Sequence, residues 1–134
     1  MRAGPAPHPV GVGHARPYAR PGIRFRKDLL CDDRVSMAEM LTVVAEMKAK
    51  PGREDDLRNA LLALVEPTRP EDGCVQYDLH IHSSDPARFL FYENWASETH
   101  LARHAASAHF TAFLEAAGGL LAEPMRVETY RRIA

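Results

Sequence analysis

The sequence predicts an α+β domain in which strands and helices follow one another in the order β-α-β-β-α-β. Three patterns support this fold class. Apolar and polar residues alternate over Cys74–His82, as in a strand with one buried face. After Arg53, apolar residues recur at the helical period. Pro-Gly and Asp-Gly pairs separate these segments as turns.

The first half of the domain is predicted to be strand, helix and strand. Met40–Lys48 is rich in β-branched and apolar residues and predicts the first strand. The helix follows Arg53 with an acidic first turn, which suits the positive end of its dipole, and is expected to end at Pro67 and Pro70. Its apolar stripe consists of Leu57, Ala60, Leu61, Leu64 and Val65. The apolar face of the next strand, Cys74–His82, consists of Val75, Tyr77, Leu79 and Ile81.

The second half of the domain is predicted to be strand, helix and strand again. Arg88–Trp95 predicts an aromatic strand. Ser97 is the expected N-cap of a helix that continues, with a break near Ser107, to about Ala117. The apolar stripe of its second half is Phe110, Phe113, Leu114 and Ala117. Met125–Ile133 predicts the last strand, and the complete order is the split βαβ arrangement of ferredoxin-like domains.

The aromatic strand has large residues on both of its faces. Leu90 and Tyr92 point away from the face that carries Phe91 and Trp95, because side chains alternate along a strand. Two helices can cover only one face of a four-stranded sheet. The other face should therefore be buried against a second copy of the chain, which predicts a homodimer.

The N-terminal segment 1–36 differs from the predicted domain at 37–134. It contains five prolines, and seven basic residues against three aspartates, without sustained periodicity. Such a segment buries too little apolar surface to offset the entropy of ordering it, so we predict that it is disordered. Two other interpretations remain open: a basic arm for an anionic partner, or an extension upstream of a true start at Met37 or Met40.

The composition of the whole chain excludes several classes of protein. A net charge of -1 gives no electrostatic basis for binding a nucleic acid or a membrane surface. Two cysteines make no disulfide framework and fit a reducing compartment. The sequence has no apolar run of about 18 residues and no apolar core of a secretory signal. A cytoplasmic protein is expected.

Aromatic rings and imidazoles gather in the stretch 89–110, which indicates a small pocket for an aromatic ligand. Glu93 shares its strand face with three of the aromatic rings. A buried carboxylate needs a partner or a function. It could accept a substrate hydroxyl or orient an imidazole, but the sequence favours an ion pair with Arg126 or Arg131 of the last strand.

Four segments together resemble one known family. They are MLTVVAEMKAKPG at 40–52, GCVQY at 73–77, FYENW at 91–95 and LARHAASAHF at 101–110. In this order and spacing they resemble the antibiotic biosynthesis monooxygenase (ABM) superfamily, and most closely its quinol monooxygenase branch. Members of that family are dimeric ferredoxin-like α/β barrels, and several oxidise hydroquinones or polyketide phenols with molecular oxygen and without metal, flavin or haem. The resemblance therefore implies a homodimer that uses no cofactor.

The haem-degrading members of the family differ from this chain at one position. They combine an Asn on the first strand with a Trp and a His. Trp95 and His104 resemble the latter two, but the Asn position falls near Ala45 or Glu46, and this strand has no Asn. The departure argues against haem as the substrate.

An oxygenase without a cofactor must make its substrate give an electron to triplet oxygen, and a phenolate does so far more readily than a phenol. His104 is the candidate catalytic base, because an imidazole titrates near neutral pH and a phenol near pH 10. Trp95 is the second candidate catalytic residue, as a pocket wall whose indole N–H binds a quinone oxygen. The candidate substrate-binding residues are Glu93, Tyr77, Phe91, His109 and Phe110. On one continuous helix, His104 and His109 are expected to point in different directions.

Two other functions and a metal site are alternatives to this hypothesis. The same cavity could serve a non-catalytic domain that binds a small aromatic metabolite, or an isomerase in which His104 moves a proton without oxygen. His80 and His82 share a strand face with Asp78, and His100 lies one helical turn before His104, both at spacings that suit metal ligands. Because no HExxH pattern or paired cysteines accompany them, no metal is expected.

Overall fold

The computed structural model describes residues 40–134. The elements are β1 (Leu41–Lys48), α3 (Glu54–Thr68), β2 (Cys74–Ile81), β3 (Arg88–Trp95), α4 (Glu98–Ala105), α5 (Ala108–Ala117) and β4 (Arg126–Tyr130). The predicted order β-α-β-β-α-β is confirmed, with the second helical region divided into α4 and α5. The predicted disordered segment at 1–36 lies outside the described residues.

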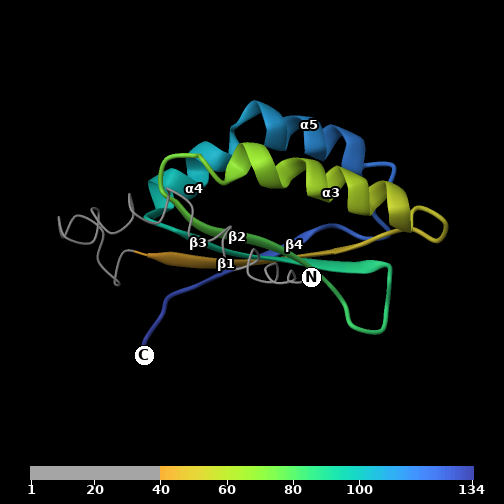
Figure 1. The fold of residues 1–134 in the computed structure, drawn as a ribbon, viewed down its shortest axis with the longest axis horizontal. Coiled ribbons are helices and arrows are strands. Elements are labelled where there is room, and N and C mark those ends of the chain that lie inside the picture. The colour runs from red at the N-terminus through yellow and green to blue at the C-terminus, as the bar shows by residue number, and fades with distance from the viewer. Residues whose placement is uncertain (1–39) are drawn as a thin grey trace, which may run out of the picture. The chain divides into compact units, whose positions relative to one another are not determined.

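The four strands form one antiparallel sheet in the order β2-β3-β1-β4. β1 is central: Leu41 lies opposite Trp95 of β3, and Thr42 lies opposite Tyr130 of β4. The three helices cover one face of this sheet, and α3 and α5 lie side by side over it (Figure 1). This is the ferredoxin-like arrangement, so the predicted fold class is confirmed.

The hydrophobic core lies between the sheet and the helices. Along β1 and β3 every second residue is buried, as the pleat of a strand with one covered face requires. From α3, the core receives Leu57, Leu61 and Leu64, all at most 2% exposed. Burying one such leucine is worth about 1.5–3 kcal/mol. The facing residues of β1 and β3 are Val43, Ala45, Met47, Phe89, Phe91 and Trp95.

Helix α3 ends between the two prolines that were predicted to end it. Pro67 lies inside the last turn of the helix, which continues to Thr68. Proline donates no backbone hydrogen bond, but the N–H of Arg69 still bonds the carbonyl of Val65 at 3.1 Å. The helix therefore closes its last turn around the proline instead of stopping at it.

The beginning of β2 departs from the predicted alternation. A bulge there shifts the register, so that Cys74 lies opposite Trp95 and Tyr77 lies opposite Glu93. Cys74 therefore packs against the core, on the face where strict alternation predicted Val75. The bulge matters for function because it fixes which side chains of β2 and β3 face each other beneath the helices.

The second helical region breaks at Ser107, as predicted. Ser107 has an extended backbone, with φ -71° and ψ 157°, and its hydroxyl accepts a hydrogen bond from the N–H of Phe110 at 3.3 Å. The same hydroxyl donates to the carbonyl of His104 at 2.7 Å. One side chain thus ends α4 and begins α5. Leu114, predicted to face the core from α5, is instead 47% exposed, because it lies at the margin of the stripe that Phe113 anchors.

The other face of the sheet is not covered by any described helix (Figure 1). It carries Tyr92 and Tyr130, which are 37% and 50% exposed, with Leu90 and Val44 partly buried beside them. The strand β4, at one edge, is exposed along its whole length. Within residues 40–134, no helix combines the length and the apolar character that crossing a bilayer requires. The homodimer that would cover the open face stays a prediction.

Candidate active site

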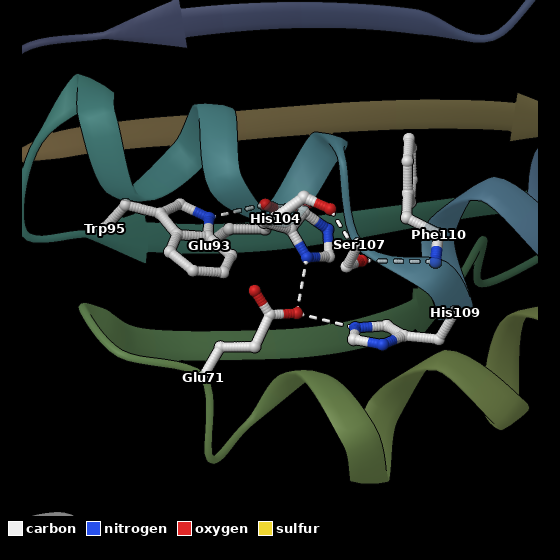
Figure 2. A network of polar contacts seen from close by, with 7 residues as sticks. All are labelled: Glu71, Glu93, Trp95, His104, Ser107, His109 and Phe110. Atoms are coloured by element: carbon white, nitrogen blue, oxygen red, sulfur yellow. Dashed lines mark hydrogen bonds and ion pairs between the residues drawn. The ribbon is translucent and has the colours of Figure 1, made fainter.

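A carboxylate from the turn after α3 joins the two helical histidines of the site. The Oε2 atom of Glu71 lies 2.9 Å from Nδ1 of His104 and 2.6 Å from Nε2 of His109 (Figure 2). An ionised carboxylate only accepts hydrogen bonds, so both ring nitrogens donate to it. In His104, Nδ1 then carries the proton, and Nε2 keeps a lone pair for a ligand.

The break at Ser107 explains why the two histidines converge. His104 lies in the last turn of α4, and His109 in the first turn of α5. Their ring centroids are 5.9 Å apart. The expectation that they point in different directions assumed one continuous helix, and it is wrong because the chain turns between them.

The turn that carries Glu71 is fixed by backbone hydrogen bonds. The N–H of Glu71 donates to the carbonyl of Thr68 at 2.9 Å, and the N–H of Cys74 donates to the carbonyl of Glu71 at 3.0 Å. Gly73 has a φ of +83°, a conformation that glycine adopts readily. Its missing side chain also leaves room for the His100 ring. The backbone of Glu71 is therefore fixed by hydrogen bonds to residues before it and after it in the chain, and this sets the position from which the carboxylate reaches the histidines.

A largely apolar cavity of about 210 Å³ lies between the helices and the sheet. Five of the seven predicted site residues line it: Tyr77, Phe91, Glu93, His104 and Phe110. The rest of the wall is aliphatic or aromatic and includes Val127 of β4, which is 49% exposed. The cavity thus combines apolar walls with a small number of titratable groups, as a site for a small aromatic molecule requires.

The remaining two predicted residues lie behind this wall. His109 does not line the cavity, but it bonds Glu71 and its ring lies beside that of His104. Trp95 is fully buried, its ring centroid is 4.9 Å from that of His104, and its Nε1–H donates to Oε1 of Glu93 at 2.8 Å (Figure 2). The indole N–H is therefore engaged by Glu93 rather than directed at a ligand.

Glu93 has a different partner from the one that the sequence favoured. Among the described residues it forms no ion pair with Arg126 or Arg131, both of which are exposed, and its hydrogen bond comes from Trp95. Burial raises the pKa of Glu93 to about 7, and the charge of Glu71 adds to this, while the bond from Trp95 acts in the opposite direction. The carboxyl group can therefore be neutral or ionised near pH 7.

Burial also decides the charge of the other two titratable groups of the cavity. It lowers the pKa of His104 below its ordinary value of 6.5, against the opposing hydrogen bond and charge of Glu71. It raises the pKa of Tyr77, as does the charge of Glu93, so the phenol stays protonated. At neutral pH the cavity therefore presents an uncharged imidazole and a phenol hydroxyl.

Sequence reasoning missed Glu71. It stands in a Pro-Glu-Asp-Gly turn, where acidic residues are common, and it is 33 positions from His104 and 38 from His109. Within the described part of the chain, Glu71, His104 and His109 are also the one set of side chains placed to hold a metal ion. The sets suggested by the sequence, Asp78 with His80 and His82, and His100 with His104, form no such group there.

A second hollow, of about 360 Å³, lies at the ends of the strands and is larger than the cavity around His104. Its lining includes Lys48, His82 and Arg88, which are all exposed. It holds no buried titratable group, so chemistry that needs an altered pKa belongs to the smaller cavity.

Comparisons with known proteins agree with the fold. The family profile described as "Antibiotic biosynthesis monooxygenase" matches residues 40–116. "Probable quinol monooxygenase YgiN" of Escherichia coli is 34% identical, and the match covers 60% of this chain and 86% of YgiN. The sequence resemblance to the family and to its quinol monooxygenase branch is thus confirmed.

Solved structures give the same result. The crystal structure of PA3566 from Pseudomonas aeruginosa is similar with a TM-score of 0.70 and 36% identity, over 74% of this chain and 99% of that one. The structure of Rv0793 from Mycobacterium tuberculosis gives a TM-score of 0.67 and 32% identity, over 71% and 96%. The family and the name of YgiN support a monooxygenase-type function. By profile, by sequence identity and by fold, the chain belongs to the antibiotic biosynthesis monooxygenase family.

Proposed function

We propose that the protein is a cofactor-independent monooxygenase that oxidises a hydroquinone or another electron-rich phenol with molecular oxygen. One observation carries the proposal: a buried, neutral imidazole, oriented by a carboxylate, lines a largely apolar cavity. The cavity volume of about 210 Å³ is below the range of sites for drug-sized ligands, which favours a substrate of one or two rings.

His104 is the base in this proposal. Its Nε2 accepts the proton of the phenol, and Glu71, bonded to Nδ1, stabilises the imidazolium that forms. The phenolate then gives an electron to oxygen, and the two radicals combine at a ring carbon. With 1-naphthol, one oxygen atom enters the ring and the other leaves as water, so that the substrate supplies all four electrons and the product is the naphthoquinone. The lowered pKa of His104 keeps the base ready at neutral pH.

The other cavity residues hold the ring and its oxygens. Phe91 and Phe110 form apolar walls, and the Tyr77 ring stacks on Phe91 with a centroid distance of 4.4 Å. Glu93, with a pKa of about 7, can donate a hydrogen bond to a substrate oxygen or accept one from it. Trp95 acts through Glu93, because its indole N–H fixes the position of that carboxyl group.

The test is oxygen uptake by the His104→Ala variant with a panel of hydroquinones and naphthols. Loss of a general base lowers turnover by about 10²–10⁴-fold, and we expect a loss of that size. His82→Ala is the matched control, because His82 is exposed and does not line the cavity. If His104→Ala consumed oxygen and formed quinone as fast as the unaltered protein, His104 would not be the base.

One further observation supports an isomerase as the second candidate. Glu93 and His104 line the same cavity, and both have altered pKa values, so one could remove a proton and the other return it. Turnover of a substrate without oxygen would support this function and contradict the oxygenase.

We also propose that the protein is a homodimer that buries the open face of the sheet. The exposed rings of Tyr92 and Tyr130 on this face, and the exposed strand β4, support the proposal.

A further inference from the structure

The carboxylate and the two imidazoles of the site have a second capability besides orienting a base. Oε2 of Glu71, Nδ1 of His104 and Nε2 of His109 come from three different segments and lie within 4.8 Å of one another. Two imidazole nitrogens and one carboxylate oxygen form a ligand set that Zn²⁺ binds, with its fourth position left to water. We propose that these three residues form a binding site for a divalent cation of the Zn²⁺ type.

The distances suit this ligand set. Zinc binds such atoms at about 2.0–2.2 Å, which places the ligand atoms about 3.3 Å from one another in a tetrahedron. The Glu71 oxygen now lies 2.9 and 2.6 Å from the two nitrogens, so these two distances must lengthen by about 0.4–1.0 Å to make room for the ion. Each histidine donates a ring N–H to Glu71, and its other ring nitrogen can carry a proton when the cation takes this position.

The cation can reach these ligands from solvent. The side chain of His104 is 4% exposed, but those of Glu71 and His109 are 17% and 25% exposed. One ligand therefore lies inside the protein, at the cavity wall, and two lie toward solvent. Because two of the three ligands are partly exposed, the site has an entry path for the ion and a position for a bound water.

Binding of the cation would change what His104 presents to the cavity. Once Nδ1 coordinates the ion, the proton of the neutral ring lies on Nε2, and the lone pair that served as base is gone. An occupied site therefore inhibits proton removal from a phenol. This consequence depends on the proposed oxygenase function, whereas the cation site itself does not.

The first experiment is calorimetric titration of the full, untagged, chelator-treated chain with Zn²⁺. We expect one ion per chain, and an affinity that falls by more than about 10-fold in His109→Gln. Glutamine keeps an amide donor for Glu71 but is a poor zinc ligand. His80→Gln is the matched control, since His80 is an exposed histidine of β2 outside the three ligands.

A second readout keeps the test independent of folding defects. Zn²⁺ should raise the Tm of the unaltered protein and of His80→Gln, and should raise it much less in His109→Gln and Glu71→Gln. Equal zinc affinity in the unaltered protein and His109→Gln would overturn the proposal. Loss of affinity in His80→Gln with retention in His109→Gln would also overturn it.

Oxygen uptake then tests whether zinc bound at this site inhibits the proposed oxygenase. With a good phenol, Zn²⁺ should inhibit the unaltered protein, a chelator should restore the rate, and His109→Gln should require more than about 10-fold more zinc. If no phenol is oxidised, the proposed function fails, but the calorimetric result still decides the cation site. If calorimetry shows that zinc binds but the rate of oxygen uptake does not change, the proposed inhibition is wrong.

Discussion

Single residues decide the chemistry of this cavity through burial rather than through their identity alone. His104 and Glu93 are 3% and 5% exposed, and each is held by one hydrogen-bond partner, Glu71 or Trp95. Burial disfavours the charged form of both, so it lowers the pKa of the base and raises that of the acid. The same physical cause therefore favours the uncharged form of both groups, the neutral imidazole of His104 and the protonated carboxyl group of Glu93.

The pH dependence of stability should reveal the altered carboxyl group. Because burial raises the pKa of Glu93 from 4.5 to about 7, the folded protein keeps a proton that the unfolded chain releases over this range. The contribution of Glu93 to stability therefore falls by about 3 kcal/mol as pH rises from 4.5 to about 7. Glu93→Gln, which keeps an oxygen to accept the Trp95 bond, should lack this contribution.

The measurement is urea denaturation of both proteins at about pH 5 and about pH 8. The difference in free energy of unfolding between the two pH values should be smaller in Glu93→Gln than in the unaltered protein. Equal differences would show that the carboxyl group titrates normally.

Two glycines with almost the same backbone conformation should respond differently to alanine. Gly73 and Gly52 have φ values of +83° and +84°. A Cβ at Gly73 would collide with the His100 ring, whereas a Cβ at Gly52 would meet no atom within 4 Å. We expect Gly52→Ala to cost about 1 kcal/mol, from its conformation alone, and Gly73→Ala to cost more than about 3 kcal/mol.

Thermal or urea denaturation of the two variants checks this prediction. Because the turn at Gly73 also places Glu71, His104 should lose its fixed orientation in Gly73→Ala and the proposed oxygenase activity should fall with stability. Equal costs at the two positions would mean that the His100 ring moves aside freely.

At the scale of elements, the break between α4 and α5 is what assembles the site. An uninterrupted helix would place residues five positions apart about 140° from each other. The extended Ser107 turns the chain instead, so that His104 and His109 both reach Glu71. The bulge in β2 acts in the same way, because it sets Tyr77 opposite Glu93.

The cap at this break can be tested directly. Ser107→Ala removes a hydroxyl that bonds both the N–H of Phe110 and the carbonyl of His104, and loss of an N-cap costs about 1 kcal/mol. Ser107→Asp keeps an acceptor for the helix N-terminus and should retain most of that stability. In urea denaturation we expect the free energy of unfolding to fall more in Ser107→Ala than in Ser107→Asp. If the loss in Ser107→Ala were no larger than that in Ser107→Asp, the capping role would be wrong.

At the scale of the whole molecule, the uncovered face of the sheet is the main unpaired surface of the described residues. Tyr92 lies near its centre, in a row with Val44 of β1 and Glu128 of β4. Tyr92→Arg should lower the mass of the particle from dimer toward monomer, because it replaces an aromatic ring of the proposed interface with a charged side chain that would have to be desolvated. Sedimentation at several concentrations measures this.

Leu62→Arg is the matched control for the interface. Leu62 is 49% exposed on α3, which covers the opposite face of the sheet. The Leu62→Arg variant should leave the mass of the particle unchanged. A monomeric unaltered chain, or a monomer in Leu62→Arg and not in Tyr92→Arg, would contradict the proposed interface.

The sequence alone determined the local features of this protein. The alternation in Arg88–Trp95 gave the strand with its bounds, and the stripe of leucines after Arg53 gave the helix and its buried face. The sequence also predicted a break near Ser107, where the structure has the N-cap of α5. Each of these depends on residues within a few positions of one another, where the period of the backbone relates spacing directly to direction.

Only the tertiary structure decided which groups meet. Glu71 reaches histidines 33 and 38 positions away, and the indole N–H of Trp95 is taken by Glu93, not by a ligand. From the sequence we predicted an arginine partner for Glu93, and we expected His104 and His109 to point in different directions. These contacts depend on how the helices pack on the sheet, on the register that the bulge in β2 sets, and on the direction in which the chain turns at Ser107. The spacing of residues along the sequence determines none of these three.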